Sequence, residues 1–154
     1  MFNNKTVYVY DRETGRVLYT VDDLSESQLS QFNVNESHYI GPSGLKISGN
    51  YVKREPMSGK PLGISPIEHM TFIDISKHEI VSDGVDEAVI SNIRMGTHVN
   101  INNEHSYVVD DETGTSLELS CNNYSYIPEH NQMTVYLKAY GCHDSKITIN
   151  VIEA

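Results

Sequence analysis

The stretch Ile-Val-Ser-Asp-Gly-Val-Asp-Glu-Ala-Val-Ile-Ser at residues 80–91, followed by Gly-Thr-His-Val-Asn-Ile-Asn at residues 96–102, decides the fold class of this chain. It predicts two β-strands joined across an Asp-Gly turn, because residue types typical of strands surround a dipeptide that favours tight turns. In the second stretch, Val99 and Ile101 share one face and polar residues occupy the other. This alternation predicts sheets with one buried face.

The same strand pattern recurs at short, even intervals through the second half of the chain. The predicted strands are residues 71–75, 87–91, 97–102, 106–109, 116–121, 133–140 and 146–152. About seven short alternating strands favour a two-sheet antiparallel sandwich of immunoglobulin-like size. Ten tyrosines and no tryptophan suit half-buried strands better than long helices. Without tryptophan, the Cys-Trp-Cys core of antibody domains is missing, so the likeness is one of architecture.

The first part of the chain has a different organisation. Residues 6–10 and 16–21 predict a hairpin, and residues 39–42 and 45–52 predict further short strands. Between them, Ser25 and Gln28 have the spacing of a capping box, which predicts one short helix that ends near Phe32.

A composition shift follows these elements. Residues 55–66 hold three of the five prolines and two glycines, which predicts a linker through which no central strand runs. We therefore expect a mainly β protein with a small hairpin-plus-helix attachment unit at residues 1–62. An immunoglobulin-like antiparallel β-sandwich is expected at residues 63–154.

The charge of the chain restricts its partners. A formal net charge of −10 disfavours a broad grip on nucleic acid or anionic lipid, since both require clustered Lys and Arg and the eleven present are scattered. No apolar run approaches the length of a membrane span, and residues 1–5 lack the apolar core of a signal peptide. We expect no nucleic-acid partner, no membrane partner and synthesis in the cytoplasm.

Candidate reactive and metal-binding residues are weak in the sequence. The histidines His38, His69, His78, His98, His105, His130 and His143 show no metal-ligand spacing and are interpreted as solvated side chains. Cys142, His143 and Asp144 are adjacent, which does not make a thiol site, because neighbours on a strand or tight loop point in different directions. Cys121 continues the inward face of its strand, so burial is expected for it. A bridge between Cys121 and Cys142 is the alternative to two free thiols.

The remaining candidate metal-binding side chains lie in acidic turns. Asp110, Asp111 and Glu112 could bind Ca²⁺ if backbone carbonyls completed the site, but the EF-hand spacing is absent and a solvated acidic turn is preferred. Residues 11–15 and 110–114 share an Asp-x-Glu-Thr-Gly pattern, interpreted as recurrent turn chemistry. Asp83 and Asp86 are likewise attributed to the start of a turn and a strand.

The tyrosines of the first third are the candidate interface residues. They are Tyr8, Tyr10, Tyr19, Tyr39 and Tyr51. Tyrosine is enriched in protein interfaces, and an exposed set could also stack on sugars. Cross-strand packing within a thin sheet is the alternative explanation.

The segment 80–121 resembles the small immunoglobulin-like domain of many tailed-bacteriophage virion proteins. The shared pieces are Asp-Gly-Val-Asp-x-Ala-x-Ile at residues 83–90, Gly-Thr-x-Val-x-Ile at 96–101, Val-Val-Asp at 108–110 and Leu-Glu-Leu at 117–119. An aromatic-proline step at residues 126–128 is similar to the one that often precedes the last strands of such domains. The strand at 83–90 is also similar to immunoglobulin-like repeats of bacterial adhesins.

The resemblance implies a non-enzymatic structural component of a phage virion, at the tail, baseplate or tail-fibre attachment. Such a protein would be assembled in the host cytoplasm, dock on other virion structural proteins through its N-terminal part and be present in several symmetric copies. No cofactor and no catalytic residue are expected. The alternatives are a head decoration protein, a cytoplasmic tail-fibre assembly chaperone and a glycan-binding adhesin module. The adhesin would need a pocket with converging polar groups, which the sequence does not reveal.

Overall fold

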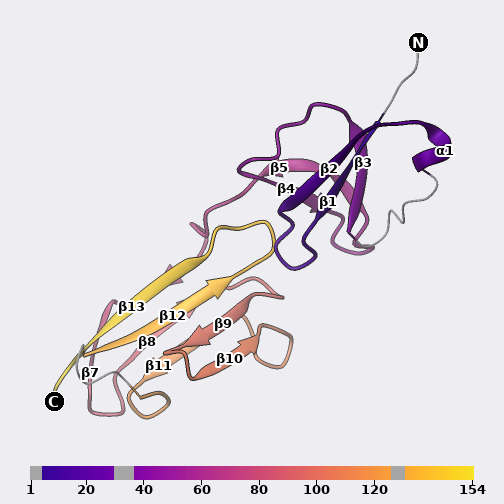
Figure 1. Cartoon of the computed structure of the whole chain (residues 1–154). Coiled ribbons are helices and arrows are strands. Elements are labelled where there is room, and N and C mark those ends of the chain that lie inside the picture. The colour runs from indigo at the N-terminus through magenta and orange to yellow at the C-terminus, as the bar shows by residue number, and fades with distance from the viewer. Residues whose placement is uncertain (1–4, 30–36, 126–130) are drawn as a thin grey trace. The chain divides into compact units, whose positions relative to one another are not determined.

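The computed structural model describes residues 5–29, 37–125 and 131–154 and is mainly β (Figure 1). The chain forms two compact units. Unit 1 comprises Met1–Glu68 together with Tyr140–Cys142, and unit 2 comprises His69–Ala139 together with His143–Ala154. Predicted residues 126–128, His130 and the helix end near Phe32 lie outside the described residues.

Unit 1 contains two small antiparallel sheets. Its elements are β1 (Lys5–Tyr10), β2 (Val17–Leu24), α1 (Glu26–Leu29), β3 (His38–Pro42), β4 (Asn50–Arg54) and β5 (Pro61–Pro66). The first sheet has the order β2-β1-β3, and β4 pairs with β5 in the second. The central strand β1 is buried at every position from Thr6 to Tyr10. Both faces of this strand are therefore covered, which explains why its sequence is a continuous run of β-branched and aromatic residues.

Within the described residues, the predicted helix is one turn long. The backbone N–H of Ser25 donates to Oε1 of Gln28 at 2.9 Å, which is one half of the predicted capping box. The backbone N–H of Gln28 donates to the carbonyl oxygen of Ser25 at 3.1 Å.

The two Asp-x-Glu-Thr-Gly turns share one geometry, which confirms the interpretation as recurrent turn chemistry. In each, Oδ1 of the leading Asp accepts the backbone N–H groups two and three residues further on, at 2.8 and 3.2 Å after Asp11 and at 3.0 and 2.8 Å after Asp110. The closing glycines are left-handed, with φ of 79° at Gly15 and 73° at Gly114. A residue with a Cβ is strained in that region, so glycine is needed there.

The predicted linker at residues 55–66 is instead the turn and second strand of the β4–β5 hairpin. The backbone N–H of Glu55 donates to the carbonyl of Lys60 at 2.9 Å, and Gly59 has a φ of 71°. Pro61 and Pro66 stand at the two ends of β5, which pairs with β4 in a two-stranded sheet of the described residues, and prolines are tolerated on such edge strands. The expected boundary at 62/63 therefore falls inside a strand, and the units divide after Glu68 instead.

Unit 2 contains two further sheets. Its strands are β6 (Asp74–Ile75), β7 (Glu79–Val81), β8 (Glu87–Ser91), β9 (His98–Ile101), β10 (His105–Val108), β11 (Leu117–Ser120), β12 (Gln132–Lys138) and β13 (Ser145–Ile152). One sheet has five strands in the order β10-β9-β12-β13-β7, and the other has three in the order β11-β8-β6. All their pairings are antiparallel except β13 with β7.

A single aliphatic core joins the two sheets of unit 2. Alternate residues of β8, β9, β11, β12 and β13 point inward and are buried with Ile80, Ile93 and Val109. The largest of the fully buried side chains include Ile90, Ile101, Leu119, Met133 and Ile149. Two sheets that share one core form a β-sandwich.

The alternation in the sequence predicted most strands of unit 2, but the strand expected at residues 71–75 is only Asp74–Ile75, and one predicted hairpin is absent. The Asp-Gly sequence at residues 83–84 does not close a hairpin, because β7 pairs with β13 in one sheet and β8 pairs with β6 and β11 in the other. Oδ1 of Asp83 instead accepts the backbone N–H groups of Val85 and Asp86, at 2.9 and 2.8 Å. This turn therefore carries the chain from one sheet to the other.

Candidate functional site

The five candidate interface tyrosines do not form one exposed surface. Tyr8 and Tyr10 are each 1% exposed, so they are core residues of unit 1 and the prediction that they contact a partner is wrong. Tyr39 is half-buried and its ring lies 5.8 Å from that of Tyr8, its direct neighbour across β1 and β3. Tyr51 is also half-buried. Tyr19 alone among the five is exposed, at 56%.

Tyr51 and Tyr10 belong to a cluster of aromatic rings around one cation. The rings of Tyr51 and Tyr140 meet edge to face with centroids 5.8 Å apart. The guanidinium carbon of Arg54 lies 4.4 Å from the centroid of Tyr140 and 6.0 Å from that of Tyr10. The Tyr140 hydroxyl donates to the carbonyl oxygen of Val52. This arrangement combines aromatic, cation–π and hydrogen-bond contacts in one place.

The turn that contains Tyr140 fits unit 1 closely. A Cβ on Gly15 would lie 2.6 Å from the Tyr140 ring, so only glycine allows the ring to approach the backbone. The backbone N–H of Gly141 donates to the carbonyl of Thr14 at 2.9 Å, and the carbonyl of Gly141 accepts the N–H of Glu68 at 3.0 Å. Burial raises the pKa of Tyr140 well above its ordinary value, and Arg54 only partly opposes that shift. These residues have a structural role.

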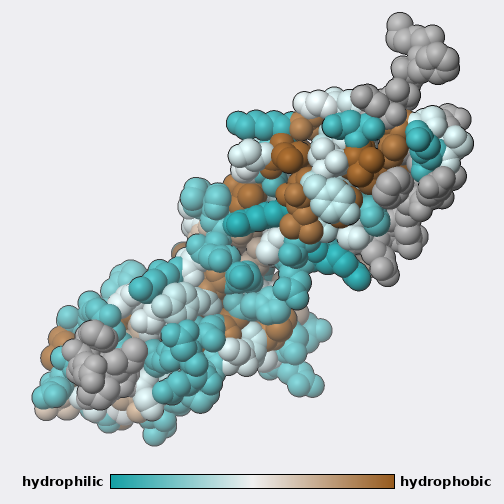
Figure 2. Space-filling model, in the orientation of Figure 1, coloured by the Kyte–Doolittle hydropathy of each residue, from teal (hydrophilic) through white to brown (hydrophobic). Residues whose placement is uncertain are grey.

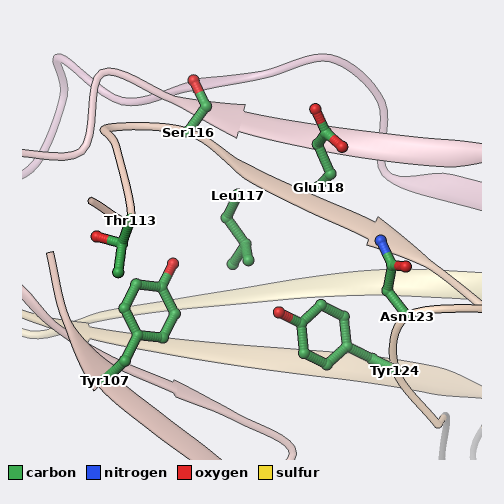
Figure 3. A pocket seen from close by; sticks show the side chains of 7 residues that line it. All are labelled: Tyr107, Thr113, Ser116, Leu117, Glu118, Asn123 and Tyr124. Carbon is green, nitrogen blue, oxygen red and sulfur yellow. The ribbon is translucent and has the colours of Figure 1, made fainter. Parts of the chain in front are cut away.

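An open groove of about 450 Å³ lies at one side of unit 2 (Figure 3). Tyr107 comes from β10, the edge of the five-stranded sheet, and Leu117 comes from β11, the edge of the three-stranded sheet. Tyr124 follows β11 in the chain and completes the aromatic lining. The polar lining residues are Thr113, Ser116, Glu118 and Asn123. The groove therefore runs between the exposed edges of the two sheets.

Two tyrosine rings dominate this groove. Figure 3 shows the hydroxyl groups of Tyr107 and Tyr124 pointing into the space between the two rings and Leu117. Both rings pack in part against the aliphatic core, and Tyr124 also meets His105 edge to face at 5.5 Å. Burial, and secondarily the nearby Tyr124, raises the pKa of Tyr107. The Tyr107 phenol is therefore neutral near pH 7, and both tyrosine hydroxyls can donate and accept hydrogen bonds.

The sequence did not reveal this groove. Tyr107 and Tyr124 are seventeen positions apart, and nothing in local periodicity indicates that they face each other. One signal was present, since Tyr107 falls on the inward side of its strand between the exposed Ser106 and Val108. An inward aromatic residue on an edge strand indicates a place where the core opens to solvent.

The acidic residues singled out in the sequence bind backbone groups. Oδ1 of Asp110 is occupied by two N–H groups of its own turn, which lower its pKa. The Lys77 ammonium is the main cause of a lowered pKa at Asp86, whose Oδ2 also accepts the N–H of Val81 at 2.7 Å. Backbone N–H groups lower the pKa of Asp83. The hydrogen bonds of these carboxylates account for their positions in turns.

The histidines and cysteines are dispersed. His69, His78, His98 and His105 are exposed, while the ring of His143 stacks on that of His69 with centroids 4.5 Å apart. Cys121 and Cys142 form no disulfide, and burial raises the pKa of Cys121. Across residues 5–29, 37–125 and 131–154, no three His, Cys, Asp or Glu side chains come together as a metal site.

Comparison with known proteins gives no match. No protein-family model, no curated protein and no solved structure is significantly similar to this chain. In the part of the chain that the structure describes, no helix has the length and apolar character needed to cross a membrane.

Proposed function

We propose that unit 2 is an immunoglobulin-like domain, and its strand order supports this. β6, β8 and β11 stand in the order of strands A, B and E of that fold, and β7, β13, β12, β9 and β10 stand in the order A′, G, F, C and C′. The parallel pairing of β7 with β13 is the one expected where a first strand divides between two sheets. The aliphatic residues at the centre replace a disulfide and tryptophan core.

On that basis the chain is a non-enzymatic structural component of a tailed-phage virion, at the tail, baseplate or tail-fibre attachment. The observation that carries this proposal is the segment 80–121, whose resemblance to virion immunoglobulin-like domains covers the strands β8, β9, β10 and β11. The carboxylates of its turn, at Asp83 and Asp86, accept hydrogen bonds from backbone N–H groups, as a structural role requires. Other virion proteins are its partners.

Unit 1 is the part that docks on other virion proteins. Its low charge and its exposed apolar side chains support this assignment. Unit 2 holds 13 of the 21 acidic residues and 4 of the 11 basic ones, and so carries −9 of the formal charge of −10, while unit 1 is nearly neutral. On the face of unit 1 in Figure 2, hydrophobic residues gather over the strands. Leu18 and Tyr19, on the free edge of β2, are 62% and 56% exposed. A weakly charged surface with apolar side chains at a strand edge suits a protein partner.

Mass spectrometry of purified particles, with tail-less heads analysed separately, tests the location. Presence in tailed particles alone, at a few copies each, is expected. Abundance in heads would replace the tail assignment by a decoration role. Absence from both would contradict a virion role and favour an assembly chaperone.

A charge substitution tests the docking surface. Leu18→Glu combined with Tyr19→Glu should leave the chain folded, because both side chains are exposed, and should prevent incorporation into particles. Met95→Glu is the matched control, since Met95 is 51% exposed on unit 2 and should be incorporated normally. Equal incorporation of both variants would show that the β2 edge is not the docking surface.

A further inference from the structure

We propose that the groove between β10 and β11 binds a neutral saccharide. Two tyrosine rings with their hydroxyl groups meet there beside one buried aliphatic residue, Leu117, in a volume of about 450 Å³ (Figure 3). That volume lies within the range of roughly 300–1,000 Å³ typical of small-molecule sites. This inference is independent of the virion role, because it concerns a ligand and not a position in a particle.

The aromatic residues supply the apolar part of such a site. A pyranose ring has faces of C–H groups and a rim of hydroxyls, so it binds where an aromatic face lies beside hydrogen-bonding groups. Tyr107 and Tyr124 offer both at once, since each ring is held against the core while its hydroxyl points into the groove (Figure 3). Held rings lose little side-chain entropy when a ligand arrives.

The polar residues supply donors and acceptors for the hydroxyl rim. In the described part of the chain, no protein group hydrogen-bonds to the hydroxyls of Tyr107, Tyr124 or Ser116, to the Glu118 carboxylate or to the Asn123 side-chain amide. The amide group of Asn123 is planar and can bind two adjacent hydroxyls together. The two tyrosine hydroxyls and the Asn123 amide thus offer unused hydrogen-bonding capacity near Leu117, whereas Ser116 and Glu118 extend from the other side of β11 (Figure 3).

The charge of the groove restricts the ligand class. Among the described residues that line it, Glu118 is the one with a carboxylate and none is basic. Unit 2 as a whole carries a formal charge of −9, from four basic and thirteen acidic residues. Anionic sugars and phosphorylated ligands are therefore repelled, whereas neutral hexoses and N-acetylhexosamines are not. The site is too polar for a lipid or other apolar ligand, which would leave these groups without partners.

The test is a titration of the ¹⁵N-labelled full chain with the neutral sugars maltotriose, cellotriose and tri-N-acetylchitotriose, followed by amide shifts in two-dimensional NMR spectra. Binding in the millimolar range or tighter by at least one of these sugars is expected, with shifts confined to residues 105–125. Trigalacturonic acid, the anionic control, should bind at least about tenfold more weakly than the best neutral sugar. No shift with any neutral trisaccharide, or shifts scattered over both units, would overturn the proposal.

Substitutions of the two tyrosines distinguish loss of sugar stacking from general effects on the fold. Tyr107→Ala and Tyr124→Ala should each weaken binding by about tenfold or more, and Tyr124→Phe, which keeps the ring, by less. The matched control is Tyr136→Ala, since Tyr136 is 39% exposed on β12 and does not line the groove; its affinity should stay within about twofold. Amide spectra of every variant report whether unit 2 is folded. Equal losses in Tyr136→Ala and Tyr107→Ala would contradict a sugar site at this groove.

An extended peptide is the competing occupant, because β10 and β11 are strand edges. A threonine- and valine-rich octapeptide, titrated in parallel, distinguishes the two. If it produces the larger shifts in β10 and β11 while the sugars produce none, the groove is a strand-accepting edge and the saccharide proposal is wrong.

Discussion

The cores of the two units differ in chemistry. Unit 2 is built from aliphatic side chains contributed by its own strands, and its packing is distributed over fifteen buried residues. Unit 1 combines the buried valines Val7, Val9 and Val52 with the buried rings of Tyr8 and Tyr10. The half-buried ring of Tyr140 packs with them from the turn after β12, far away in sequence. An aliphatic core tolerates redistribution of volume, whereas a core of hydroxyl-bearing rings depends on particular contacts. Unit 1 should therefore be the more easily broken of the two.

The largest expected effect is on fragments of the chain. A fragment of residues 69–154 should fold and melt cooperatively, because its aliphatic core is complete. A fragment of residues 1–68 should have no cooperative transition, because it lacks the Tyr140 ring and both backbone hydrogen bonds of Gly141. Circular dichroism melts of both fragments check this. A cooperative transition in residues 1–68 would show that the turn is dispensable for unit 1.

The Tyr140→Ala substitution should unfold unit 1 in the full chain. Removing a large aromatic ring from a packed site costs about 3–5 kcal/mol, and here a hydrogen bond to Val52 and the contact with Arg54 are lost as well. Hydrogen exchange should show loss of protection in β1 and β4 while β9 and β12 stay protected. Tyr136→Ala, at an exposed site on β12, should change stability by about 0.5 kcal/mol or less. Equal protection of β1 in both variants would contradict a central role for Tyr140.

The strands could be predicted from the sequence where alternation alone determines structure. The contacts between residues far apart in the sequence could not. The strands β8, β9 and β11 follow from residues such as Ile90, Val99 and Leu119, whose two-residue period has one physical meaning. The prediction of a linker at residues 55–66 was wrong because proline and glycine are common both in linkers and in edge hairpins. The pairing of β5 with β4 distinguishes the two. Tyr107 and Tyr124 could not be paired in advance, since they meet only when both pack against the shared core of the two sheets.

The Gly15→Ala substitution sharpens the comparison, because unit 2 contains the same turn. Gly15 and Gly114 both close an Asp-x-Glu-Thr-Gly turn with nearly equal φ, so alanine should cost about 1 kcal/mol of backbone strain at either position. At Gly15 the new Cβ would also meet the Tyr140 ring at 2.6 Å, whereas nothing lies within 4 Å at Gly114. We expect Gly15→Ala to destabilise unit 1 by about 1–3 kcal/mol more than Gly114→Ala destabilises unit 2. Denaturant melts measure both losses, and equal losses would show that the ring moves aside freely.

The smallest expected effects are opposite responses of the two units to pH. The pKa of Asp86 in the folded chain lies below its ordinary value of 3.8, mainly because of Lys77, so its contribution to the stability of unit 2 is present above that value and is lost as the pH falls through the folded pKa. Tyr140 behaves in the reverse way. Its folded pKa is raised above 10 by burial, so its contribution to unit 1 is complete below pH 10 and is lost as the pH rises through the folded value.

Two conservative variants isolate these responses. Asp86→Asn should make the acid side of the stability profile of unit 2 less steep without changing unit 1, since the partners of its carboxylate, Lys77 and the Val81 backbone, both belong to unit 2. Tyr140→Phe should flatten the alkaline side of the stability profile of unit 1. Tyr107 in unit 2 also has a raised pKa, so this variant is needed to assign the alkaline loss of stability in unit 1 to Tyr140. Chemical denaturation from acid to alkaline pH, read by amide signals of each unit, measures both profiles. If Tyr140→Phe left the alkaline limb of unit 1 unchanged, another group would have to titrate there, and the ring's burial would not be what makes unit 1 sensitive to alkali.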